Sequence, residues 1–152
     1  MIKKIVLKQY QDIVNSAAKH ISPVTRPPEG WICTVRKSLN MSGAQLARRL
    51  KVTRARVSQA EKGEIAGALT LKTMQEMAAA MNCQFVYAII PNQDIETLIH
   101  QQAVEKATDL VRSASNHMAL EMQGLSKYQL TDEISRVTYE LQEKMPADFW
   151  DK

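Results

Sequence analysis

The sequence predicts a mainly α-helical protein: a bundle of short helices, one short β strand and a C-terminal helical extension. Three observations lead to this prediction. Apolar residues recur at helical spacing through most of the chain. A β-branched and aromatic run, residues 84–90 (QFVYAII), interrupts them and ends at Pro91. Amphipathic spacing then resumes at Ile95. With 152 residues, 45% of them hydrophobic, the chain can form a domain with an appendage.

The stretch that organises the chain is residues 41–63, MSGAQLARRLKVTRARVSQAEKG. Ser42 and Thr53 are placed to cap two short helices. Lys51 and Val52 break the chain between these helices, and Gly63 is expected to end the second. The apolar faces of the pair are formed by Leu46, Ala47, Leu50, Val57 and Ala60. Two short helices joined in this way form a helix-turn-helix.

The outward face of the second helix has the composition of a surface that reads DNA bases. Arginine suits guanine, glutamine suits adenine and alanine can meet a thymine methyl group. The residues on this face are Arg54, Ala55, Arg56, Ser58 and Gln59. Residues suited to phosphate lie around it: Ser42, Gly43, Gln45, Arg48, Arg49, Lys51, Thr53 and Lys62. The alternative is an αα-hairpin inside a helical core, with a solvated basic face.

Charge is divided unevenly along the chain. Residues 24–63 carry nine Lys or Arg against two Glu, a net charge of +7. Residues 64–152 carry seven basic and thirteen acidic side chains, a net charge of −6, and residues 1–23 add +3. A basic block on an acidic remainder is expected when one face meets phosphate and the rest does not.

The remaining helices are predicted at residues 2–20, 29–39 and 71–81. Pro28 is expected to open the second of these, which would bury Trp31, Ile32, Val35 and Leu39. The predicted strand needs a partner, either residues 1–8 or the same strand of a second subunit. The chain thus divides into an N-terminal helix (1–23), a DNA-binding bundle (24–82), a strand (83–91) and a helical dimerisation or partner-binding region (92–152).

The C-terminal region carries two apolar stripes, from Ala103 to Met118 and from Leu130 to Met145, with an interruption at Gly124. These stripes require burial, on the bundle, on a second subunit or on another protein. We expect the first stripe to pack internally and against a second subunit. The last helix, with Phe149 and Trp150, is expected to clamp a neighbouring molecule.

No catalytic residue, cofactor or metal ligand is predicted. Phosphate-binding glycine loops, nucleophile elbows and His/Glu metal pairs are absent from the sequence. Cys33 and Cys83 are isolated from each other and from the scattered histidines, which fits a reducing cytosol and disfavours zinc. The N-terminus lacks the apolar core of a signal peptide, and no apolar run approaches the ~20 residues of a membrane span. The predicted location is cytoplasmic.

The helix-turn-helix stretch resembles the Cro/CI-type (lambda-repressor-like, XRE) family. The residues that carry the resemblance are Leu46, Ala47, Leu50, Val52, Thr53, Val57, Ser58, Glu61 and Gly63. The resemblance implies a bundle in which Arg36 of the first helix forms an ion pair with Glu61 of the third. Gly43 stands where the family often has a phosphate-binding glutamine. That contact would come from the Gly43 amide or from Gln45.

A narrower resemblance is to the bacterial family called mobile mystery protein A. It rests on RPPEGWI, TLKTMQEMAAAMNCQFVYAIIP, HMALEMQ and the final Phe-Trp-Asp. The family accompanies a Fic-domain protein, which implies a regulator or antitoxin of a Fic-type toxin. The Ser/Thr-x-x-x-Glu-Gly/Asn motif of Fic-inhibiting helices is absent; Thr138 comes nearest, with Gln142 in place of Glu.

The predicted function is therefore a homodimeric, sequence-specific DNA-binding regulator in the bacterial nucleoid. Its partners would be operator DNA, a second copy and a Fic-domain protein, and it would repress its own operon. The alternative is a protein-interaction module that neutralises a partner protein through its acidic C-terminal helices.

Overall fold

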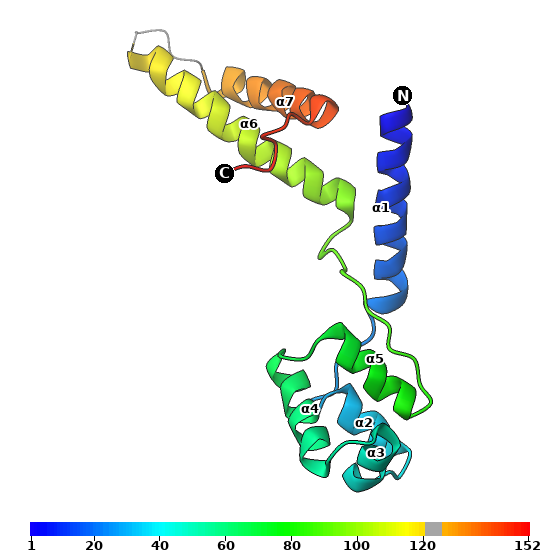
Figure 1. The fold of residues 1–152 in the computed structure, drawn as a ribbon. Helices are drawn as coiled ribbons and strands as arrows, with labels where there is room; N and C mark the ends of the chain where they lie inside the picture. Colours follow the sequence, from blue (N-terminus) through cyan, green and yellow to red (C-terminus); the bar gives the residue numbers. More distant parts are fainter. Residues whose placement is uncertain (121–125) are drawn as a thin grey trace. The chain divides into compact units, whose positions relative to one another are not determined.

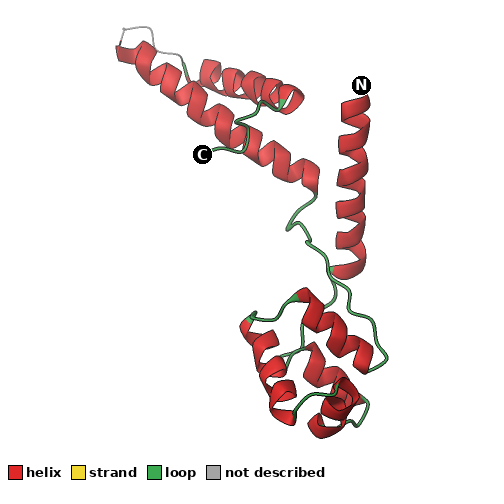
Figure 2. Ribbon diagram, in the orientation of Figure 1, coloured by secondary structure: helices red, strands yellow, loops and turns green. Residues whose placement is uncertain are grey.

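The computed structural model describes residues 1–120 and 126–152, which form seven α helices and contain no β strand (Figures 1 and 2). The chain folds as two compact units. Unit 1 comprises residues 1–19 and 90–152, and unit 2 comprises residues 20–89. The interruption predicted at Gly124 and the side chain of Met118 lie outside the described part. The mainly helical fold class is confirmed, and the strand predicted at residues 84–90 is not formed among the described residues of the single chain.

Unit 2 is a bundle of four short helices. They are α2 (Trp31–Ser38), α3 (Gly43–Leu50), α4 (Arg54–Ala66) and α5 (Leu71–Ala80). A hydroxyl residue precedes each of the last three and accepts a hydrogen bond from a backbone N–H of the first turn: Ser42, Thr53 and Thr70. These caps fix where the helices begin, because they satisfy amides that have no partner inside the helix.

The core of unit 2 draws on all four helices. It consists of Ile32, Leu46, Ala47, Val57, Ala60, Met77 and Met81. Leu46 is completely buried. Trp31 and Leu39, which the sequence predicted to face inward, are 39% and 49% exposed. Trp31 opens α2 and Leu39 follows its last turn, so neither lies on the central face of this short helix.

Two predicted helix ends are wrong for the same reason. α4 continues through Gly63 and ends at Ala66, where Gly67 takes the left-handed conformation with φ 72°. A left-handed residue stops a helix at little cost only where it is glycine. α2 begins at Trp31 and not at Pro28, and Gly30 before it has φ 83°. In both places the glycine that adopts positive φ sets the boundary.

Residues 84–90 form no strand and run through the structure without regular secondary structure. Their side chains are mostly exposed: Val86 is 70% and Ile89 is 91% exposed. Residues 1–8, one of the two partners predicted for this strand, lie at the start of the structure and in helix α1 (Ile2–Ile21). A strand exists only when its backbone pairs with another, and none of the described residues forms a backbone hydrogen bond with this segment.

Unit 1 is built around a pair of helices that lie side by side, α6 (Ile95–Leu120) and α7 (Lys127–Lys144) (Figure 1). Its buried side chains are Ala103, Ala107, Val111, Thr138 and Phe149. Phe149, which was expected to clamp a neighbouring molecule, is only 1% exposed within its own unit. The Gln102 side chain donates a hydrogen bond to the Phe149 carbonyl at 2.8 Å, whereas Trp150 remains 58% exposed.

Helix α1 contacts α6 and α7 through polar groups. Lys4 pairs with Glu143 at 2.8 Å, and Lys8 pairs with Glu96 at 2.9 Å. The Asn15 side chain donates to Glu96 and accepts from the Ile95 amide, at 2.9 and 3.0 Å. None of the α1 residues is buried, and its exposed apolar side chains are Ile2, Ile5, Val6, Leu7, Tyr10 and Ile13. The polar face of α1 therefore faces its own chain and the apolar face is open.

The contact between α1 and the start of α6 predicts a pH dependence. The Lys8 hydrogen bond, the Glu96 backbone amide and Asn15 lower the pKa of Glu96 from the ordinary 4.5 to about 2. Because the pKa is lowered, the contact stabilises the docked helix above pH 4.5 and is lost as the pH falls toward 2. We expect an NMR titration of the Glu96 carboxyl to give a midpoint near 2.

The Lys8→Ala variant should move this midpoint back toward the ordinary value. Lys3→Ala removes the same charge from the same exposed helix and should leave the midpoint in place. A Glu96 midpoint near 4.5 in the unaltered protein would show that α1 does not dock in solution.

Candidate nucleic-acid interface

The turn between α3 and α4 is set by local interactions. Ser42 and Gln45 form a reciprocal capping box at the start of α3: the Gln45 amide donates to Ser42 Oγ at 3.1 Å and the Ser42 amide donates to Gln45 Oε1 at 2.7 Å. Lys51 takes the left-handed conformation, and the Val52 amide donates to the Ala47 carbonyl at 3.0 Å. Thr53 then caps α4, so that two short helices meet across a three-residue turn.

Helix α4 presents its predicted base-reading residues to solvent. Val57 and Ala60 are buried in the core, at 2% and 3% exposure. The opposite side carries the exposed residues Arg54, Ala55, Arg56, Ser58 and Gln59. The arginines and Gln59 can therefore reach a partner without any change in the core, which is the arrangement that a helix needs to enter a DNA groove.

The residues predicted to contact phosphate differ in whether their side chains already make contacts within the bundle. Arg48, Lys51 and Lys62 are exposed, and no ion pair within the described residues involves them. Arg49 is also exposed, but its Nε donates to the Ala80 carbonyl at 2.5 Å and so joins α3 to the end of α5. The Ser42 and Thr53 hydroxyl oxygens accept the capping bonds, which leaves their O–H groups as donors. Gln45 and Gly43 lie beside Ser42 at the start of α3.

Arg36 of α2 and Glu61 of α4 form an ion pair between the two helices. Arg36 Nε and Nη2 donate to the two Glu61 oxygens at 2.6 and 3.2 Å, and Nη1 donates to the Met41 carbonyl at 2.9 Å. The side chains are 14% and 18% exposed. The hydrogen bond to Glu61 raises the pKa of Arg36. Bidentate pairs of this kind fix geometry as well as charge.

Glu64 was missed by the sequence analysis, which placed it in a loop after Gly63. It lies on α4 and is 9% exposed, and its Oε1 accepts from the amides of Trp31 and Ile32 at 2.9 and 3.3 Å. Two signals could have indicated it. Gly30 has no side chain with which to cap α2, and Glu64 follows Glu61 by three residues, which places both on one helix face.

One comparison with known proteins bears on the type of this bundle. Residues 34–87 match the family model described as helix-turn-helix. The match supports a DNA-binding helix-turn-helix of the Cro/CI (XRE) type. It spans α3, the turn and α4, together with most of α2 and all of α5. No curated protein and no solved structure matched the chain.

No helix among the described residues is long and apolar enough to cross a membrane. No three His, Cys, Asp or Glu side chains among the same residues lie close enough together to hold a metal ion. Cys33 is buried and Cys83 is exposed, and both are free thiols.

The ion pair between α2 and α4 predicts a stability loss. Arg36→Ala leaves the largely buried Glu61 carboxylate without its partner. The free energy of unfolding should therefore fall by about 2 kcal/mol. Chemical denaturation monitored by circular dichroism measures this change. Arg136→Ala is the matched control, because Arg136 makes comparable pairs with Glu133 and Glu140 on the exposed surface of α7. It should change stability little, and equal losses in the two variants would contradict the structural role of Arg36.

Proposed function

We propose that this protein is a sequence-specific DNA-binding transcriptional regulator that acts as a homodimer. The observation that supports this proposal most directly is the exposed outer face of α4. Five residues with the chemistry of base readout stand there, on a helix whose other side is buried and attached to α2. We place this function in the bacterial cytoplasm, at the nucleoid, and the bacterial origin rests on the resemblance to mobile mystery protein A.

Binding would combine two contributions. Arg48, Lys51 and Lys62 would contact phosphates and position the protein without reading sequence. Gln45, Arg48 and Arg49 also line a hollow of about 460 Å³ at the α3 surface, where a phosphate group could lie. Arg54, Ala55, Arg56, Ser58 and Gln59 would meet base edges in the major groove. The net charge of +7 on residues 24–63 would draw the bundle to DNA.

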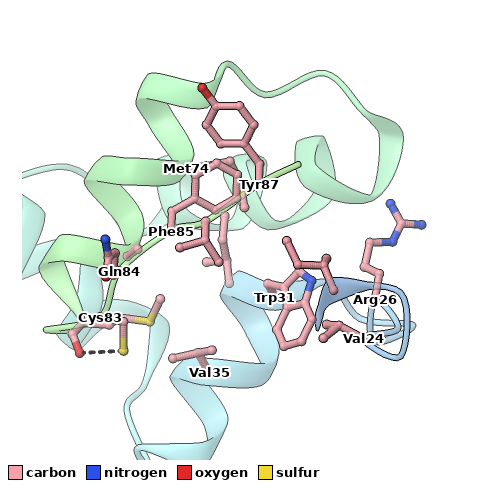
Figure 3. Close-up of a pocket in the computed structure, with 14 residues that line it drawn as sticks. Val24, Arg26, Trp31, Val35, Met74, Cys83, Gln84, Phe85 and Tyr87 are labelled. Carbon is pink, nitrogen blue, oxygen red and sulfur yellow. Dashed lines mark hydrogen bonds between the residues drawn. The ribbon is translucent and has the colours of Figure 1, made fainter. Parts of the chain in front are cut away.

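The second copy would pair through residues 84–90. No backbone hydrogen bond within the described chain engages these residues. They border an apolar hollow of about 520 Å³ in unit 2 (Figure 3). Trp31, Val35 and Met74 line this hollow together with Phe85 and Tyr87, whose rings stack at 5.8 Å. Pairing of two such segments across a twofold axis would satisfy their backbone groups and cover the hollow.

Repression of its own operon, and action as the antitoxin of a Fic-domain protein, belong to the same proposal. They rest on the resemblance to mobile mystery protein A. Direct blocking of a Fic active site by the Thr138 helix receives no support. Thr138 is 5% exposed and its hydroxyl donates to the Ile134 carbonyl, while Gln142 lies beside His100.

A second function, neutralisation of a partner protein by the acidic helices, is favoured by one observation. A hollow of about 680 Å³ between α6 and α7 combines apolar residues with Asp132, Glu133 and Arg136, and Arg136 pairs with Glu133 at 2.6 Å, which leaves the Asp132 charge without that partner. Salt-dependent binding of promoter DNA by the protein alone distinguishes the two functions. Footprinting on the DNA upstream of its gene tests the first directly, and a protein that protects no site there would contradict autorepression.

The base-reading role of α4 predicts a selective loss of affinity. Arg54→Ala or Arg56→Ala should weaken binding to the cognate site by about 1–3 kcal/mol and weaken binding to random DNA much less. Fluorescence anisotropy on cognate and random duplexes measures both. Lys72→Ala, which removes an exposed charge from α5, is the control. Arg48→Ala should instead weaken all sequences alike and lower the salt dependence. Equal losses on both duplexes for the α4 variants would show that Arg54 and Arg56 contact only phosphate.

Pairing of residues 84–90 predicts that the protein is a dimer in the absence of DNA. Val86→Pro removes a backbone donor and should give monomers that bind the operator more weakly. Val86→Ala is the control, because it shortens the side chain and keeps the N–H. Sedimentation velocity measures the change. A Val86→Pro variant that remains a dimer would place the interface elsewhere.

A further inference from the structure

Two carboxylates on α4 reach different ends of α2. Glu61 pairs with Arg36 in the last turn of α2, at 2.6 Å. Glu64 accepts hydrogen bonds from Trp31 and Ile32 in the first turn, at 2.9 and 3.3 Å. The two acceptors lie three residues apart and therefore on the same face of α4. The recognition helix is attached to α2 at two separate points.

The second attachment is enclosed. Glu64 is 9% exposed, and its Oε2 is buried without a hydrogen-bond partner among the described residues. This oxygen lies against Gly30: a Cβ added there would stand 1.8 Å from it. Gly30 also has φ 83°, and as the N-cap residue of α2 it has no side chain with which to cap the helix. The absence of a side chain at Gly30 leaves space for the Glu64 carboxylate. The carboxylate accepts the amide hydrogen bonds that an N-cap side chain would otherwise accept.

The separation of the two points determines what they restrain. Arg36 and Trp31 lie about 7.5 Å apart along α2, and Glu61 and Glu64 lie about 4.5 Å apart along α4, at 1.5 Å per residue. With one attachment, only side-chain packing would restrain rotation of α4 about that contact, and packing tolerates a scatter of about 15–20° in crossing angle. With two attachments at different points, the direction of α4 is fixed.

This direction matters because the base-reading residues are far from the attachments. Arg54 precedes Glu61, the attachment that remains if Glu64 is lost, by seven residues, or about 10.5 Å along the helix. A swing of only ~5° about Glu61 would displace the Arg54 backbone by about 0.9 Å, which exceeds the ~0.5 Å tolerance of a well-organised recognition site.

We propose that Glu64 is a positioning residue for base recognition: by accepting the first amides of α2 it fixes the direction in which α4 presents Arg54, Arg56 and Gln59. This role rests on the proposed function, since it needs a cognate site to act on. It assigns Glu64 a share in selectivity for one DNA sequence over others, and none in general affinity for DNA.

The test compares two conservative variants with opposite properties. Glu64→Gln keeps the length of the side chain and an acceptor oxygen but removes the charge. Glu64→Asp keeps the charge but is one methylene too short to reach the α2 amides. If Glu64 acts by position, Glu64→Asp should lose at least tenfold in affinity for the cognate duplex and less than twofold for random DNA. Glu64→Gln should lose less than threefold on either duplex. A purely electrostatic role would reverse this order.

Glu76→Asp provides the matched control, because Glu76 is an exposed glutamate of α5 in the same unit. It should match the unaltered protein on both duplexes. Amide hydrogen exchange at Trp31 and Ile32, measured without DNA, gives a second readout: it should be at least tenfold faster in Glu64→Asp than in the control.

The outcomes separate the two proposals. If the unaltered protein shows no preference for any DNA sequence, the proposed function fails, and the positioning role fails with it. If the unaltered protein is selective, three results overturn the positioning role alone. These are unchanged selectivity in Glu64→Asp, equal losses on cognate and random DNA, and unchanged exchange at the two amides.

Discussion

The attachment of α4 to α2 is the constraint on which the rest of unit 2 depends. α2 and α3 have only eight residues each, and helices of that length are unstable in isolation. They persist because they pack against α4 around Leu46 and Val57. Burial of apolar surface is non-directional, and side-chain packing sets helix crossing angles only to within about 15–20°. The directional contacts are polar: the Arg36–Glu61 pair and the acceptance of the α2 amides by Glu64.

Much of this bundle could be predicted from the sequence because its signals are local. Ser42 and Thr53 predict the starts of two helices because they can cap them, and the helical spacing of apolar residues identifies Leu46 and Val57 as core. The contacts of Glu64 could not be predicted in this way. They join residues more than thirty positions apart, and they exist only because α4 passes Gly63 without stopping. Gly63 was the nearer stop signal, but Gly67 adopts the left-handed conformation.

Periodicity shows which face of an element is apolar, but it cannot show what covers that face. α1 was predicted as a helix from its apolar spacing, and it is one. Its apolar side nevertheless stays open, and Lys4 and Lys8 pair with residues of α7 and α6. Residues 84–90 illustrate the same point for a strand. Their β-branched and aromatic character predicts extended backbone, but a strand also requires a second backbone to pair with, and none of the described residues provides one.

The acidic residues of unit 2 show how affinity and orientation can be separated in one small bundle. Within residues 20–89 there are ten Lys or Arg and four Glu, a net charge of +6. Any exposed carboxylate near the DNA-facing side would oppose phosphate binding. Three of the four Glu are engaged inside the unit: Glu29 with Lys37, Glu61 with Arg36, and Glu64 with the α2 amides. Glu29 and Glu61 thus pair with Lys37 and Arg36, two cations that are not among the residues predicted to contact DNA. On the proposed function, Glu61 and Glu64 would orient α4 while the exposed cations of α3 and α4 remain available for phosphate. Sequence selectivity and general affinity for DNA would then depend on different side chains.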